Sequence, residues 1–327
     1  MSPRGWILFA LMSVIWGIPY LMIKVAVDSV SVPVVVFART AIGALLLLPF
    51  AWAGLRRLRG HAWPLLAFAV LEILGPWWLL SDAERHLSSS MTGLLIAVVP
   101  VFAVLLARAT GGRERLGARR WAGLGVGLGG VAVLAAPELR GGDAWSVTEV
   151  LLTAVGYAAG PLVAARYLRD VPTLPLTAGC LSFAALVYAL PAAATWPAEP
   201  PPGRVLAALA GLGVVCTALA FLVFFELIRE VGTSRAMVIT YVNPAVAVGA
   251  GMIFLNEPLS GTITAAFALI LGGSFLATSR SPEAAPDGAP QARGTMDSTA
   301  DEPAGRPRRG PKDLAEERPG SAGQGGR

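Results

Sequence analysis

The sequence predicts an all-α integral membrane protein with ten transmembrane helices, arranged as two inverted five-helix repeats. Only 14% of the residues are charged, and the mean hydropathy is +0.63. Apolar runs of about 20 residues, separated by short charged or Pro/Gly-rich links, are typical of membrane-spanning helices. These runs lack the alternation of apolar and polar residues that is typical of β-barrel strands. A third observation, a motif that occurs twice, predicts the repeat.

Ten apolar runs follow one another from the N-terminus with short links. We predict spans near residues 6–26, 33–53, 63–80, 88–107, 119–136, 146–165, 174–194, 205–227, 233–255 and 261–279. The first run lacks a small-x-small cleavage site and is too long for a signal peptide, so we interpret it as the first membrane helix. Cys180 and Cys216 fall inside apolar runs and are expected to be packing residues rather than a disulfide.

The arginines in the links predict the orientation. With the N-terminus in the cytoplasm, thirteen arginines lie in cytoplasmic links, and only Arg85, Arg140 and Arg204 lie in outer links. This asymmetry obeys the positive-inside rule, and an even number of spans puts both termini inside. We therefore expect a multi-pass protein of the cell membrane, in a bacterial plasma membrane. The pI near 9.7 reflects this orientation and not a nucleic-acid partner.

The motif that occurs twice lies at residues 85–116 and 229–259. Each copy has a charged link, a small polar cluster, an apolar run with a proline, and then an acidic residue. The matching pairs are Arg85 with Arg229, Ser90 with Ser234, Pro100 with Pro244, and Glu114 with Glu257. Because one unit has five helices, an odd number, the second copy must enter the membrane upside down. Inverted repeats are the architecture of many secondary transporters, although a channel or scaffold could also be duplicated.

These features divide the chain into three parts. We expect a first repeat at residues 1–137, a second at residues 138–280, and a disordered cytoplasmic tail at residues 281–327. The tail is rich in Pro, Gly and charged residues, and such a segment buries too little apolar surface to offset its ordering entropy.

Several segments together resemble a known family. They are SVIWGIPYLMIKVA, FARTAIGALLLLP, RHLSSSMTGLLIAVVP, REVGTSRAMVITYVNP and LNEPLSG. In their order and double occurrence they resemble the drug/metabolite transporter superfamily, and specifically its EamA-type branch, over about residues 5–279. The resemblance implies ten helices, two cytoplasmic termini, and a central cavity that usually serves export of amino acids, drugs or related metabolites. One departure is LEILGPWW, with a glutamate and a proline where many relatives have apolar and aromatic residues.

Two charged residues lie within predicted spans. An ionised Glu72 would cost about 2.5 kcal/mol or more in the membrane, so it is expected to face a cavity or a partner. It is our candidate for proton coupling; a structural acid is the alternative. Arg39 lies about 9 Å along its helix from Pro33. It stays charged, so it must snorkel, pair with Glu72, or hold a substrate carboxylate.

Other residues complete the predicted substrate cavity. Trp16, Tyr157 and Tyr241 supply aromatic surface, and Asn243 could hydrogen-bond substrate or satisfy the local backbone. Pro100 and Pro244 interrupt helices at matching positions, and paired interruptions point towards the binding site. The predicted substrate-binding set is thus Trp16, Arg39, Glu72, Tyr157, Tyr241 and Asn243.

The function we predict is secondary active transport of a small metabolite, amino-acid-like or drug-like. We expect an exporter that works by alternating access in the lipid bilayer, with protons as one candidate coupling ion. An intramembrane lipid-modifying enzyme and a channel are the alternatives. The sequence offers no cluster of catalytic residues, metal ligands or cofactor motif, and His61 and His86 lie in links on opposite sides. Either a monomer or a homodimer is compatible with it.

Overall fold

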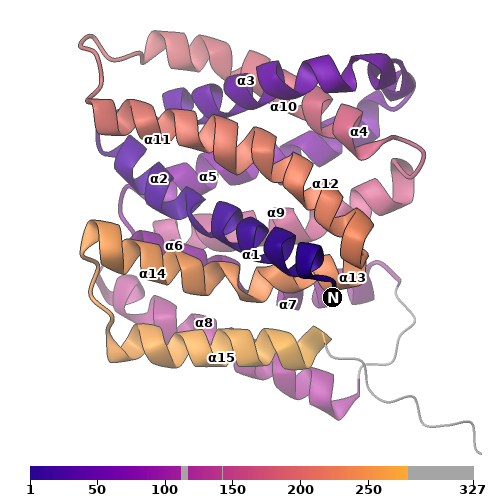
Figure 1. Ribbon diagram of the computed structural model, residues 1–327. Coiled ribbons are helices and arrows are strands. Elements are labelled where there is room, and N and C mark those ends of the chain that lie inside the picture. Colours follow the sequence, from indigo (N-terminus) through magenta and orange to yellow (C-terminus); the bar gives the residue numbers. More distant parts are fainter. Residues whose placement is uncertain (112–116, 142, 279–327) are drawn as a thin grey trace, which may run out of the picture. The chain divides into compact units, whose positions relative to one another are not determined.

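The computed structural model describes residues 1–111, 117–141 and 143–278. Within this part every regular element is a helix (Figure 1). Glu114 and the tail predicted at residues 281–327 lie outside the described residues.

The helices of the first half include several broken spans. They are α1 (Pro3–Gly17), α2 (Pro19–Val27), α3 (Val32–Ala51), the 3₁₀ segment η1 (Trp52–Leu58), α4 (Ala62–Ala69), the π-helical η2 (Val70–Leu74), α5 (Gly75–Ala83), α6 (Ser89–Ile96), α7 (Val99–Ala109) and α8 (Ala118–Gly141). The break between α1 and α2 falls before Pro19, and the break between α6 and α7 falls before Pro100. Proline has no N–H to donate, so each break leaves helix carbonyls in need of other partners.

The second half follows the same order. Its elements are α9 (Ala144–Tyr167), α10 (Thr173–Ala194), α11 (Gly203–Gly213), the π-helical η3 (Val214–Leu219), α12 (Ala220–Val231), α13 (Thr233–Ala236), the 3₁₀ segment η4 (Met237–Tyr241), α14 (Asn243–Leu255) and α15 (Gly261–Thr278).

Nine helical segments of the described chain are long and apolar enough to cross a membrane. The remaining predicted span, at residues 233–255, is divided into α13, η4 and α14, and α14 alone has 13 residues. The interruption falls at Asn243 and Pro244, at the start of α14, where the sequence predicted that Pro244 breaks a helix. The sequence predicted the break but not that the segment would be in three pieces.

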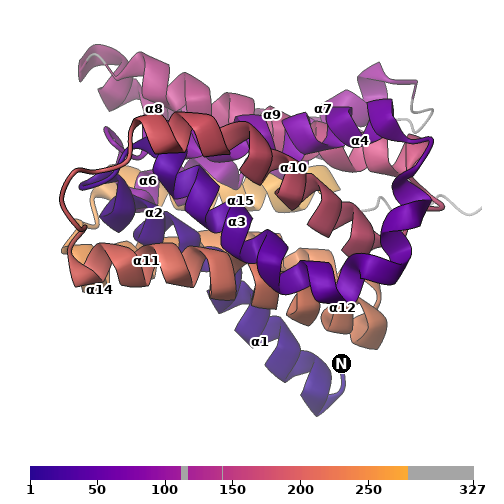
Figure 2. The same cartoon turned by 90° about the horizontal axis from the view of Figure 1, so that it is seen from above.

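Two long helix pairs flank the bundle. Figures 1 and 2 show α3 beside α10, and Figure 1 shows α15 beside α8. In the second pair, a Cβ added at Gly127 of α8 would come within 3.7 Å of the Gly273 carbonyl carbon, and one added at Gly273 would lie 2.2 Å from the Gly127 nitrogen. Small residues at such a contact let two helix backbones approach closely in a membrane.

Further helix contacts also join one half of the chain to the other. The first span packs against the eighth through α1 with α12 and α2 with α11, and the third packs against the sixth through α4 and α5 with α9. The helices α6 and α14 pack against each other. Every one of these pairings is preserved when the two halves are exchanged.

The two π-helical segments η2 and η3 start 144 residues apart, at Val70 and Val214. A π-helical turn adds a residue to the helix and is frequent at functional sites. Both segments lie in the middle of long spans: η2 carries Glu72, and η3 carries Thr217, which accepts a hydrogen bond from Arg39.

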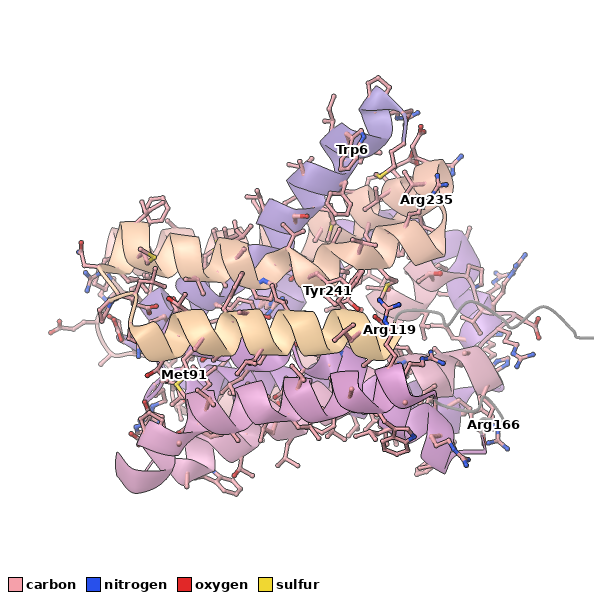
Figure 3. The ribbon with its side chains drawn as sticks, turned by 90° about the horizontal axis from the view of Figure 1, so that it is seen from below. Trp6, Met91, Arg119, Arg166, Arg235 and Tyr241 are labelled. Atoms are coloured by element: carbon pink, nitrogen blue, oxygen red, sulfur yellow. The ribbon has the colours of Figure 1, made fainter. Side chains whose placement is uncertain are left out.

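The two ends of the bundle differ in charge. Figure 3 shows Arg119, Arg166 and Arg235 at the end where Figure 1 places the N-terminus, and Met91 towards the other end. We call these the N-terminal end and the far end. The far end carries the links after α2, α5 and α14.

Candidate functional site

Arg39 forms the centre of the candidate site. The helix α3 carries it about 10 Å from the helix start at Val32, and its side chain is buried, at 8% exposure. Its Nε donates to Oγ1 of Thr217 at 3.1 Å, and its guanidinium lies over the Trp77 ring at 3.7 Å. A guanidinium favours such a contact with an aromatic face. Three spans therefore fix the orientation of this one charge.

Thr217 reaches Arg39 because of the π-helical turn in η3. Its hydroxyl donates to the carbonyl of Leu212, five residues earlier, at 2.8 Å. The wider turn thus orients the same oxygen that accepts from Arg39. The sequence did not identify Thr217 or Trp77 as site residues, because neither hydrogen-bond direction nor ring stacking can be seen in one apolar run.

Arg39 has no acidic partner among the described residues. None of the ion pairs there includes Arg39, and the pair with Glu72 considered in the sequence is not formed. A guanidinium keeps its charge, and a buried charge needs a partner. The two terminal amino groups of Arg39 are therefore suited to bind an anionic group that is not part of the protein.

Glu72 lies in η2 and faces α9. Its Oε2 is enclosed and has no hydrogen-bond partner. A Cβ added at Gly160 would lie 2.3 Å from this oxygen, and one added at Gly156 would lie 2.5 Å from the carbonyl oxygen of Leu71. The GYAAG sequence of α9 therefore supplies the small surface on which the π-helical turn of η2 packs.

The other predicted site residues divide into two groups. Tyr157 lies within electrostatic range of Arg39 and close to Trp77. Trp16 instead packs on Phe221 and Phe224, with ring centroids 6.5 and 4.7 Å away.

Asn243 and Tyr241 also contact other parts of the protein. The amide nitrogen of Asn243, in the orientation that satisfies the whole amide, donates to the carbonyls of Ile239 at 3.0 Å and Ser13 at 3.3 Å. The hydroxyl of Tyr241 contacts Ser274 and Thr278 of α15 (Figure 3). The structure thus brings Tyr157 to Arg39 and gives Asn243 and Tyr241 contacts with backbone and with α15.

The helix interruptions at Pro100 and Pro244 are closed by side chains. The Ser274 hydroxyl donates to the carbonyl of Ala97, next to the first break, at 3.0 Å. At the second break, the side-chain amide of Asn243 donates to the carbonyl of Ile239. These carbonyls therefore already have partners, as buried backbone groups require.

Glu257 ties the two halves together at the far end. Its Oε1 accepts from the backbone nitrogen and hydroxyl of Ser89, at 2.8 and 2.9 Å, and its Oε2 accepts from the nitrogen of Ser90 at 2.9 Å and from the Ser90 hydroxyl. A carboxylate is favourable at a helix N-terminus, here that of α6. The carboxylate folds back over Gly251, where an added Cβ would lie 2.3 Å from Oε2.

Comparison with known proteins decides the family. The sequence pattern of the EamA-like transporter family matches the chain twice, at residues 3–136 and 144–279. The chain belongs to the EamA-like transporter family. Both the family match and the long apolar helices indicate that it is a multi-pass membrane protein.

Several transporters are similar over nearly the whole chain. The uncharacterized inner membrane transporter YedA of Escherichia coli is 28% identical over 300 residues, which cover 85% of this chain and 94% of that protein. The uncharacterized transporter YvbV of Bacillus subtilis is 27% identical, over 85% of this chain and 92% of that protein. The probable terminal-alkyne amino-acid exporter of Streptantibioticus cattleyicolor is 28% identical, over 86% and 95% respectively.

A solved crystal structure shares the fold. It matches with a TM-score of 0.60 and 22% identity, over 85% of this chain and 98% of that one. The relatives' names indicate a small-molecule substrate and a membrane setting. In the described part of the chain no group of His, Cys, Asp and Glu side chains could hold a metal ion.

Proposed function

We propose that this protein is a secondary active transporter that exports a small metabolite bearing a carboxylate, in the class of amino acids. The observation that carries the proposal is the buried Arg39, held by Trp77 and Thr217 and lacking an acidic partner in the described chain. A planar guanidinium binds a carboxylate through two parallel hydrogen bonds. The similarity to a probable amino-acid exporter supports the same substrate class.

Transport would proceed by alternating access of two inverted five-helix repeats, residues 1–137 and 138–280. Three features support this arrangement: the double family match, the helix pairings that are preserved when the halves are exchanged, and the π-helical segments 144 residues apart. In such proteins the site lies between the repeats, which rock about it. Arg39 on α3 and Thr217 on η3 come from opposite halves and would move relative to each other.

The protein would be oriented with its N-terminal end in the cytoplasm. The arginines at that end support this orientation, since positive loops remain inside. The far end, where Glu257 joins α14 to α6, would then be the closed outer side.

Substrate binding offers the direct test of Arg39. Purified protein in liposomes should take up labelled neutral amino acids saturably, and Arg39→Gln should weaken their affinity by about tenfold or more, the equivalent of about 1.4 kcal/mol. Arg85→Gln is the matched control, because Arg85 is exposed and pairs with Asp82 at the surface. Unchanged affinity in Arg39→Gln would contradict the proposed site.

Glu72 is proposed as the proton-coupling residue. Its enclosed oxygen without a partner supports a group that gains and loses a proton during the cycle. Substrate-induced proton flux in liposomes should disappear in Glu72→Gln and persist in Glu226→Gln, a surface control that pairs with Arg4 and Arg229. Unchanged flux in Glu72→Gln would make Glu72 a structural residue.

A further inference from the structure

Glu84 is a buried carboxylate that the proposed function does not use. It follows α5 directly, one residue beyond the membrane-spanning segment Ala62–Ala83, and is 0% exposed. Both of its carboxylate oxygens are enclosed and have no hydrogen-bond partner. Burying such a group is costly unless it is paired, so this position calls for a partner.

The nearby lysine does not supply that partner. Lys24 of α2 donates from Nζ to the backbone carbonyl of Glu84 at 2.6 Å, not to its carboxylate. None of the ion pairs of the described chain includes Glu84. Lys24 therefore fixes the backbone at the end of α5 and leaves both oxygens of the carboxylate without a hydrogen-bond partner.

Glu84 and Arg39 belong to one electrostatic neighbourhood. The two charges act on each other, and the buried Tyr20 of α2 lies within range of both. They form no ion pair, so they lie near each other without contact. A cation on α3 and an anion at the end of α5, neither of them in an ion pair, are opposite in sign, as are the two ends of a zwitterion.

We propose that Glu84 binds the ammonium group of the substrate whose carboxylate binds Arg39. The inference rests on the proposed function and narrows its substrate class to amino acids with a free α-amino group. Each charged end of the ligand would then supply the partner that one buried protein charge lacks. Charge-assisted hydrogen bonds of this kind are roughly twice as strong as neutral ones.

The electrostatics of Glu84 agree with this role. Burial raises the pKa of the Glu84 carboxyl well above its ordinary range. The positive charges of Lys24 and Arg39 oppose that rise, and the Glu257 carboxylate adds to it. A ligand ammonium group would favour the ionised form further. An amino acid is thus held by a charge that it helps to create, whereas a deaminated acid gains nothing from Glu84.

Titration calorimetry on the full chain in detergent tests the inference with three probe pairs. Each pair is an amino acid and its deaminated acid: alanine and propanoate, leucine and 4-methylpentanoate, phenylalanine and 3-phenylpropanoate. In at least one pair, Glu84→Gln should weaken binding of the amino acid by about tenfold or more and leave its deaminated acid within about twofold. Retained binding of the deaminated acid also shows that the variant is folded. Asp82→Asn is the control, an acid on the same helix end that pairs with Arg85.

Three outcomes would overturn the inference. If both members of every bound pair bind equally well and Glu84→Gln changes neither, Glu84 is not a ligand group, while the carboxylate site at Arg39 stands. Equal weakening of both members would make Glu84 a structural residue. Binding of no member of any pair would overturn the inference together with the proposed substrate class.

Discussion

At the scale of single residues, two buried charges without acidic or basic partners in the described chain define the account. The Trp77 ring and the Thr217 hydroxyl orient Arg39. Lys24 donates a hydrogen bond to the backbone carbonyl of Glu84. Arg39 and Glu72 could be chosen as candidate site residues from the sequence, since charged residues inside apolar runs are rare. Glu84 could not, because it stands between Asp82 and Arg85 in what resembles a solvated link, and only the fold encloses it.

Substituting Arg39 by lysine separates charge from geometry. Arg39→Lys keeps the positive charge but loses the planar fork and the broad contact with Trp77, so carboxylate binding should weaken by about tenfold. Equilibrium binding of a neutral amino acid measures the change, with Arg85→Lys as the exposed control. Full affinity in Arg39→Lys would show that only net charge matters at this position.

Amino-acid binding should depend on pH through Glu84. Because burial raises the pKa of its carboxyl, acidification protonates the group and removes the charge that the ammonium requires. Affinity for an amino acid should therefore fall as pH falls, and this dependence should be reduced in Glu84→Gln. The charged and titratable groups near Glu84 are Lys24, Arg39, Glu257 and Tyr20. Because the Lys24 charge lowers the Glu84 pKa, Lys24→Gln should move the pH dependence to higher pH if the titration belongs to Glu84. A pH profile identical in wild type and Glu84→Gln would count against the assignment.

At the scale of elements, the Glu257 contact at the far end lies against one glycine. Gly251 lies under the Glu257 carboxylate, whereas a Cβ added at Gly249 of the same helix would meet nothing within 4 Å. We expect Gly251→Ala to displace the carboxylate from α6 and to destabilise the protein by about 1–3 kcal/mol. Gly249→Ala should be neutral or slightly stabilising. Thermal unfolding in detergent compares the two, and equal melting temperatures would argue against the importance of this contact.

Opening of the far end can be measured with a native cysteine. Cys216 is buried next to Met22, and Cys180→Ala removes the other cysteine of the chain. In that background, Gly251→Ala and Glu257→Gln should both speed labelling of Cys216 by a thiol reagent that cannot cross the membrane. Labelling as slow as in the Gly249→Ala control would show that Glu257 does not hold the far end closed.

Helix periodicity and proline positions predicted most elements but not their irregular turns. The breaks at Pro100 and Pro244 follow from the missing N–H of proline. The π-helical turns of η2 and η3 have no such local signal, because Val70–Leu74 and Val214–Leu219 are ordinary apolar sequence. They arise from packing, with Gly156 and Gly160 of α9 against η2 and Thr217 bonded five residues back in η3.

At the scale of the whole molecule, membrane class and family were predictable from apolar runs and from the repeated motif. Both are properties that a sequence carries along its entire length. The contacts between the halves could not be predicted from the sequence, because they depend on which faces of equally apolar helices meet. Trp16 shows this limit, since its depth in the first span did not reveal that it packs on Phe221 and Phe224.

The proposed orientation has a direct test in intact cells. In a chain lacking Cys180 and Cys216, Ser260→Cys at the exposed far end should react with an impermeant thiol reagent added outside. Ala118→Cys, exposed at the start of α8 on the other end, should react only after the membrane is permeabilised. The reverse pattern would invert the proposed topology.

The most direct measurement of the central claim is exchange across a membrane by purified protein. Liposomes are loaded with an unlabelled neutral amino acid, and entry of the labelled amino acid is followed against empty liposomes. An alternating-access carrier with Arg39 in its site should show saturable entry, accelerated by substrate on the other side and lost in Arg39→Gln. Entry that neither saturates nor responds to internal substrate, or that is unaffected by Arg39→Gln, would contradict the account.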